Sequence, residues 1–222
     1  MDFTALVLPH SFHLVGWAGL AWLGWRWALS GDWRELGNPS RLNLFFGATV
    51  VLLALWQIRT GVRPGLAFHL YGISALTLMF GFWRACFAGT LILLGNVLFG
   101  RGTLTALGID MLLQVALPAT VSWYVFRLVE RHLPANFFIY VIGNGFFGAA
   151  LAVAMIGLAT AVVMLLGGVY PLDYLLSQYL PYASLLISWA EAFSTGMAIT
   201  VMAVYRPAWL ETFDDVKYLS NK

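Results

Sequence analysis

Long apolar segments follow one another along almost the whole chain, separated by short polar or glycine-containing stretches. A helix needs about 20 mostly apolar residues to cross a bilayer, and segments of roughly this kind recur in order. We expect seven membrane-spanning helices, at residues 11–29, 42–60, 66–80, 82–99, 104–129, 136–166 and 181–205. The pattern therefore predicts an all-α, polytopic integral membrane helix bundle.

The breaks between these segments define the expected organisation. Gly81 and Arg84 divide an apolar stretch that is too long for one helix, and we interpret Arg84 as a loop charge. Residues 167–180 are expected to form a semi-polar connection outside the membrane. We therefore predict one transmembrane bundle over residues 1–205 and a short cytoplasmic tail over residues 206–222.

The distribution of basic residues predicts the orientation of the bundle, because cytoplasmic loops carry an excess of Lys and Arg. With the N-terminus outside, nine of the 12 Lys and Arg residues fall on the cytoplasmic side, and Arg59, Arg63 and Arg101 fall outside. The opposite orientation would reverse this bias. The prediction of seven spans and the prediction of an outer N-terminus with a cytoplasmic C-terminus therefore support each other.

Composition excludes several classes of protein. Hydrophobic residues make up 61% of the chain and charged residues 10%. In soluble domains, about 45–50% of residues are apolar and about 25% are charged. A formal net charge of +2 without a long basic run predicts no nucleic-acid partner. The single cysteine, Cys86, excludes an internal disulfide framework and is expected to pack as an apolar residue. The start Met1-Asp2, without a basic segment, predicts no cleavable signal peptide.

Ionisable groups inside a membrane are costly and mark candidate functional positions. His13, His69, Asp110 and Glu191 are the main candidates, with His10, Asn96 and Gln114 as weaker ones. In the predicted orientation they gather in the outer half of the bundle. Imidazole nitrogens and carboxylates there suit capture of a divalent transition metal ion from outside. The alternatives are an interfacial position for His10 and an ordinary helix-to-helix contact for Asp110.

Catalytic and nucleotide-binding motifs give no support for an enzyme. Residues 143–148 fit G-x-G-x-x-G literally, but no strand precedes them and they lie in a predicted membrane helix. The P-loop, H-E-x-x-H and G-x-S-x-G motifs do not occur in the sequence. We therefore predict no enzymatic activity and no tightly bound organic cofactor, so that any ATP hydrolysis would belong to separate subunits.

Three segments resemble one family of transporters. Residues 68–72 (FHLYG) resemble a "G-H-L-L-G" segment, residues 98–108 (LFGRGTLTALG) resemble "L-F-G-D-G-G-L-T-A-L-G", and residues 189–195 (WAEAFST) resemble "I-G-E-G-L-I-T". These three motifs are typical of the CbiM/NikM-like energy-coupling-factor (ECF) ABC transporter permeases, and the segments that resemble them occur here in the family's order. The tail from residue 205 resembles a divergent proteobacterial branch of this family, which implies the bacterial cytoplasmic (inner) membrane.

The resemblance implies a function and a ligand. The family captures cobalt or nickel and works with a transmembrane coupling subunit and cytoplasmic ATPases, which would dock on the inner loops and the tail. His69 matches the family's metal-ligating histidine. The family's other ligands come from a free amino terminus followed by histidine, whereas this chain begins Met1-Asp2. Asp110 also stands where the family has a neutral amide.

Two further functions compete with metal capture. The absence of the amino-terminal histidine favours a membrane assembly subunit that kept the fold without transporting. A haem-binding redox protein would need two facing histidines at matching depth, for which His13 and His69 are the candidates.

Overall fold

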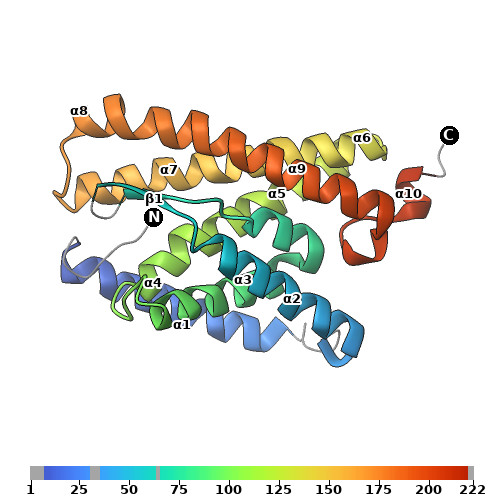
Figure 1. The fold of residues 1–222 in the computed structure, drawn as a ribbon, viewed down its shortest axis with the longest axis horizontal. Helices are drawn as coiled ribbons and strands as arrows, with labels where there is room; N and C mark the ends of the chain where they lie inside the picture. The colour runs from blue at the N-terminus through green and yellow to red at the C-terminus, as the bar shows by residue number, and fades with distance from the viewer. Residues whose placement is uncertain (1–7, 31–35, 64–65, 220–222) are drawn as a thin grey trace.

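A computed structural model gives the fold over residues 8–30, 36–63 and 66–219 (Figure 1). The first two helices are α1 (His10–Ser30) and α2 (Pro39–Leu55), followed by strands β1 (Thr60–Arg63) and β2 (Leu66–Phe68) and by α3 (Ile73–Leu98). Next come α4 (Leu107–Asp110), α5 (Leu117–His132), α6 (Phe137–Ile139), α7 (Ala149–Leu166), α8 (Leu172–Tyr174), α9 (Ser188–Tyr205) and α10 (Asp215–Leu219). π-helical turns join α4 to α5, α6 to α7, and α8 to α9 into longer helices.

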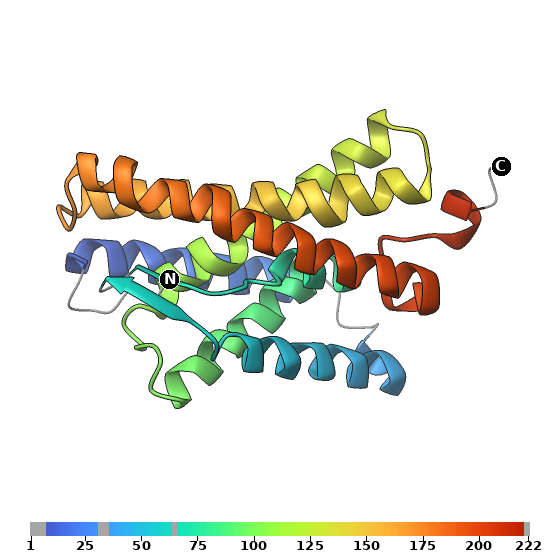
Figure 2. The same ribbon diagram turned by 45° about the horizontal axis from the view of Figure 1, so that its top comes forward.

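Four helices of the described ranges are long and apolar enough to cross a membrane unaided: Ile73–Leu98, Leu107–His132, Phe137–Leu166 and Leu172–Tyr205. α2 is a shorter apolar helix of 17 residues. The last two long helices lie side by side along the longest axis of the molecule (Figures 1 and 2). The helical membrane bundle is therefore confirmed, while seven crossings and the orientation of the termini stay predictions.

The helix α3 changes direction at Gly81. This residue has φ 77° and ψ 173°, a conformation that is outside the helical region and favours glycine. Before the break, Phe80 packs on Phe45 of α2, and after it Phe87 packs on the same ring. At the other end of α2, Leu52 lies against Gly72 and Leu53 against Gly95. The two halves of α3 therefore run along α2 in opposite directions, and the predicted division at Gly81 marks a chain reversal.

A hairpin of two short strands corrects the expected second and third spans. Helix α2 ends at Leu55 instead of residue 60, and Thr60 of β1 pairs with Phe68 of β2 in an antiparallel ladder. The predicted span 66–80 is therefore helical only from Ile73 onward. Strand β2 is buried throughout, whereas Thr60, Gly61 and Arg63 of β1 are exposed.

The connection expected at residues 167–180 is also corrected, because the last helix already begins at Leu172. Pro181 lies inside this helix, where its ring removes one backbone hydrogen bond. π-helical turns at Leu175–Tyr179 and Tyr182–Ile187 flank it, and Ser184 donates its hydroxyl to the carbonyl of Leu180. Local rearrangements of this kind let a membrane helix continue through proline.

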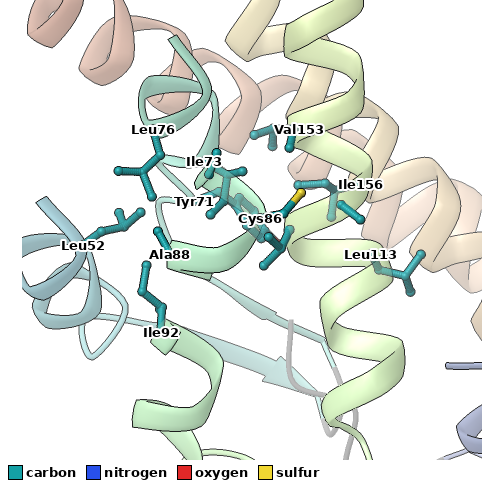
Figure 3. Packing of buried hydrophobic residues seen from close by; sticks show 14 of the residues in the cluster. Leu52, Tyr71, Ile73, Leu76, Cys86, Ala88, Ile92, Leu113, Val153 and Ile156 are labelled. Atoms are coloured by element: carbon teal, nitrogen blue, oxygen red, sulfur yellow. The ribbon is translucent and has the colours of Figure 1, made fainter. Parts of the chain in front are cut away.

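The core is apolar and closely packed where helices meet. Buried side chains from α2, α3, α7 and the turns before α5 interdigitate in the centre (Figure 3), and Cys86 lies among them as predicted. Helices α1 and α4 approach each other closely, since a Cβ on Gly16 would lie 2.4 Å from the nitrogen of Ile109. Small residues permit such contacts in membrane bundles.

The C-terminal segment packs against the bundle. The tail supplies donors to carbonyls at the end of the first half of α3, next to the reversal at Gly81. Glu211 and Thr212 donate their backbone N–H groups to Met79 and Leu78 at 3.2 and 3.3 Å.

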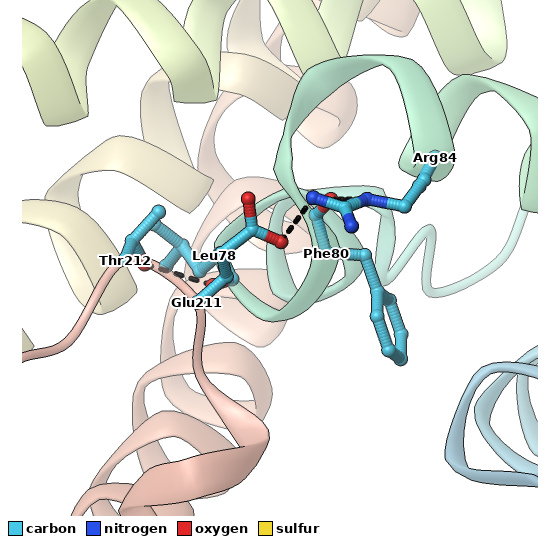
Figure 4. Close-up of polar contacts among 5 residues, drawn as sticks. All are labelled: Leu78, Phe80, Arg84, Glu211 and Thr212. Atoms are coloured by element: carbon cyan, nitrogen blue, oxygen red, sulfur yellow. Dashed lines mark hydrogen bonds and ion pairs between the residues drawn. The ribbon is translucent and has the colours of Figure 1, made fainter. Parts of the chain in front are cut away.

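Arg84 corrects the prediction of a loop charge, because it is buried. It donates to the carbonyl of Phe80 and forms an ion pair with Glu211 (Figure 4). The sequence pattern correctly placed Arg84 at a break in the chain. It did not predict the partner of Arg84, Glu211, which lies 127 residues further on.

Candidate metal-binding site

His69 lies directly after β2 in the irregular segment that leads into α3, and it is buried. Its ring lies 4.5 Å, between centroids, from both Trp56 and Tyr71. Because the two aromatic rings confine the imidazole, its orientation is fixed by packing. Gly72, at φ 63°, makes the tight connection from this segment into α3.

A chain of polar groups starts at the far nitrogen of His69. Nε2 lies 3.3 Å from Oε1 of Gln114, and Nε2 of Gln114 donates to Oδ1 of Asp110 at 2.6 Å. The other ring nitrogen, Nδ1, faces the carbonyl of Leu70 at 3.1 Å. A neutral imidazole carries one N–H, so it donates to one of these two oxygens and leaves the second nitrogen with a free lone pair.

Glu191 holds the backbone that carries His69. Its carboxylate accepts the N–H groups of Tyr71 and Gly72 at 2.8 and 2.6 Å, and the hydroxyl of Thr195 at 3.3 Å. The side chain is fully buried, and these donors satisfy the charge that burial would otherwise leave unpaired. Glu191 therefore acts on the His69 segment as an anchor of its backbone.

Trp56 anchors the same segment from α2. Its indole Nε1 donates to the carbonyl of Tyr71 at 2.8 Å. Sequence reasoning missed Trp56 and Tyr71, because neither side chain is charged at neutral pH. The only signal for them was that Tyr71 lies within the FHLYG segment and that Trp56 precedes the predicted end of a span.

His13 is buried on α1, and neither of its ring nitrogens has a hydrogen-bond partner among the described residues. It lies one turn before Gly16, at the close contact with α4. His10, by contrast, is exposed at the first position of α1. Of the two histidines of α1, only His13 is therefore buried.

Asn96 belongs to a second polar pair at the end of α3. Its Oδ1 accepts the amide of Gln57 at 2.8 Å, and Gln57 also donates to the carbonyl of Leu53 at 3.0 Å. This pair fastens the turn after α2 to α3.

The candidate residues do not form one preassembled cluster. Within residues 8–30, 36–63 and 66–219, no three His, Cys, Asp or Glu side chains come together as a metal-ligand group. His69, Gln114 and Asp110 form one chain of contacts, Glu191 binds backbone, and His13 lies on α1. Met1 and Asp2, where the family resemblance places further ligands, are outside the described residues.

Comparison with known proteins gives one family and one fold. The family model CbiM, described as the cobalt uptake substrate-specific transmembrane region, matches residues 5–209. A solved structure of a truncated transition metal transporter superposes with a TM-score of 0.80 at 18% identity, covering 92% of this chain and 99% of that one. A second transition metal transporter structure gives 0.75 at 18% identity, with 92% and 93% covered. A search of curated proteins finds no match.

Proposed function

This chain belongs to the CbiM family of cobalt uptake substrate-specific transmembrane regions, and we propose that it is the membrane component that captures a divalent transition metal ion for uptake. The ion is cobalt or nickel, and His69 is its central protein ligand. The observation that carries this proposal is the environment of His69: a buried imidazole, confined by two aromatic rings, whose Nε2 faces an amide and carboxylate pair.

The donor set fits such an ion. Neutral imidazole is a good ligand for cobalt and nickel, and amide and carboxylate oxygens complete mixed nitrogen and oxygen sites. The Nε2 lone pair of His69 would bind the ion when Nδ1–H donates to Leu70. Gln114 contacts Nε2, and Asp110 contacts Gln114 in turn. These two side chains would therefore orient the imidazole or supply oxygen ligands. A metal bound there would replace the contact between His69 and Gln114.

Capture alone does not move the ion across the membrane. We propose that the chain works with a transmembrane coupling subunit and cytoplasmic ATPases, because it has no nucleotide-binding loop of its own. In the orientation with the N-terminus outside, the His69 segment lies in the outer half of the bundle. The inner loops and the tail then face the coupling subunit and the ATPases. The membrane is the bacterial cytoplasmic membrane.

The test is uptake of radioactive cobalt or nickel by cells that express the chain with its coupling subunits. His69→Ala should reduce uptake to the level of cells without the chain, because the ion loses its nitrogen ligand. His132→Ala is the matched control, since His132 is exposed at the end of α5. Equal uptake by the wild type and His69→Ala would contradict the proposal.

Other outcomes distinguish the competing functions. A chain that binds no metal and supports no uptake, yet copurifies with another membrane complex, would support an assembly subunit. A Soret absorption band in the purified protein would support haem binding. Neither is favoured by a specific contact among the described residues.

A further inference from the structure

A large cavity lies away from His69, between α1, the break in α3, and the long helix containing α5. Its volume is about 870 Å³. On α1 it runs from Gly19 to Arg26, and on the neighbouring helix from Leu112 to Arg127. At 1.5 Å per residue, the cavity therefore extends from the middle of the bundle to one of its ends.

The lining changes in character along this length. Gly19, Leu112, Ala116 and Leu117 make the deep end apolar. The shallow end is aromatic and basic, with side chains of Trp22, Trp123, Tyr124, Arg26 and Arg127. Tryptophan, tyrosine and arginine at the same level are typical of the boundary between hydrocarbon and headgroups.

The charges at the shallow end favour an anion. Arg26 and Arg127 are both exposed, and Glu211, the acid that lines the cavity, is paired with the buried Arg84. Glu130 is a further acid near this end, and its carboxylate lies 4.0 Å from Arg127 and also accepts from Lys217. Among the residues that the structure describes, the basic groups Arg26, Arg127, Arg84 and Lys217 therefore outnumber the acids Glu211 and Glu130 there.

We propose that this cavity is a binding site for one anionic phospholipid. The phosphate lies between Arg26 and Arg127, and one acyl chain extends past Trp22 to the apolar end at Gly19 and Leu112. Basic pockets between membrane helices on the cytoplasmic side recognise anionic headgroups in this way, and the predicted orientation places Arg26 and Arg127 on that side.

The dimensions of the cavity favour a lipid over a helix of another protein. A helix about 10 Å wide would fill the volume within about two turns, whereas an alkyl chain is thin enough to extend along the whole cavity. The gradient from apolar to basic along one axis also matches an amphiphile. This inference does not depend on metal uptake.

Native mass spectrometry of the purified full chain tests the proposal. The protein is titrated with palmitoyl-oleoyl phosphatidylglycerol or with the zwitterionic phosphatidylcholine of the same chains. We expect phosphatidylglycerol to bind more tightly, and Arg26→Gln with Arg127→Gln to weaken it about 5-fold per arginine. Arg206→Gln is the matched control, because Arg206 is exposed next to α9 and does not line the cavity.

Two further variants keep the test independent of folding defects. Arg26→Lys with Arg127→Lys retains the charge and should retain most of the preference for phosphatidylglycerol. Thr120→Phe adds bulk to the lining of the cavity without changing charge, and it should reduce binding of both lipids. Equal binding of the two lipids by the wild type would overturn the proposal, as would an unchanged preference in the double glutamine variant.

Discussion

His69 is held by a near neighbour, Tyr71, and by two residues further away in the sequence, Trp56 and Glu191. The rings of Trp56 and Tyr71 confine the imidazole, Trp56 also binds the carbonyl of Tyr71, and Glu191 accepts the backbone N–H groups of Tyr71 and Gly72. The role of Glu191 is therefore to position the segment, although its burial and charge made it a candidate ligand. A binding group held this way loses little conformational freedom when a ligand arrives.

Glu191→Gln tests this role at the scale of one residue. The amide can accept one backbone N–H, but its NH2 group then faces the second, which is left without an acceptor. We expect the variant to lose about 1–3 kcal/mol of stability, measured as the midpoint of SDS unfolding in mixed micelles. Glu130→Gln is the control, because Glu130 forms only surface pairs with Arg127 and Lys217, which contribute about 0–1 kcal/mol. Equal midpoints for the wild type and Glu191→Gln would contradict the anchoring role.

At the scale of elements, the reversal at Gly81 shapes one end of the bundle. It folds α3 into two halves along α2, and the tail donates to the carbonyls of Leu78 and Met79 just before the reversal. The sequence predicted the break correctly because Gly81 and the charged Arg84 interrupt an apolar run. It did not predict that the charge would be buried.

Gly81→Ala tests the reversal. A Cβ at φ 77° and ψ 173° is strained, so we expect a loss of about 1–3 kcal/mol in SDS unfolding. Gly47→Ala is the control within α2, where a Cβ would meet nothing within 4 Å. A helical glycine-to-alanine change should leave the midpoint unchanged or raise stability by up to about 1 kcal/mol. Stability of Gly81→Ala equal to that of the control would show that the backbone does not need glycine there.

The helices were more predictable than the hairpin and the polar contacts. Apolar runs and breakers are local signals, and they located α1 and the helices over residues 107–132 and 137–166 within a few residues, whereas α2 ends five residues before its predicted end. The hairpin of β1 and β2 carries no such signal, because its strands are only four and three residues long and their pairing depends on the rest of the fold. The partners of Glu191 and Arg84 lie more than 100 residues away along the chain, and only the fold brings them together.

At the scale of the whole molecule, the chain forms one helical bundle whose tail packs on one end. Phe213 stacks on Tyr218 and contacts Tyr140, whose hydroxyl bonds to Thr212. Asp214 accepts the backbone N–H groups of Val216 and Lys217 in α10. The described part of the tail is therefore structured and packed against the bundle.

The orientation is testable by labelling with a membrane-impermeant maleimide. Arg101 and Pro134 are exposed at opposite ends of the helix Leu107–His132, and the native Cys86 is buried. We expect Arg101→Cys to be labelled in intact cells and Pro134→Cys only after permeabilisation. The reverse pattern would place the N-terminus inside and overturn the predicted topology.

The central claim is that His69 binds the transported ion, and the metal content of the detergent-purified chain tests it most directly. Cells are grown with trace cobalt, nickel, zinc and copper, and the wild type is compared with His69→Ala and with His132→Ala. We expect about one equivalent of a single metal per chain in the wild type and in His132→Ala, and its loss in His69→Ala. A bound metal that survives His69→Ala, or a wild type that binds none, would contradict the account.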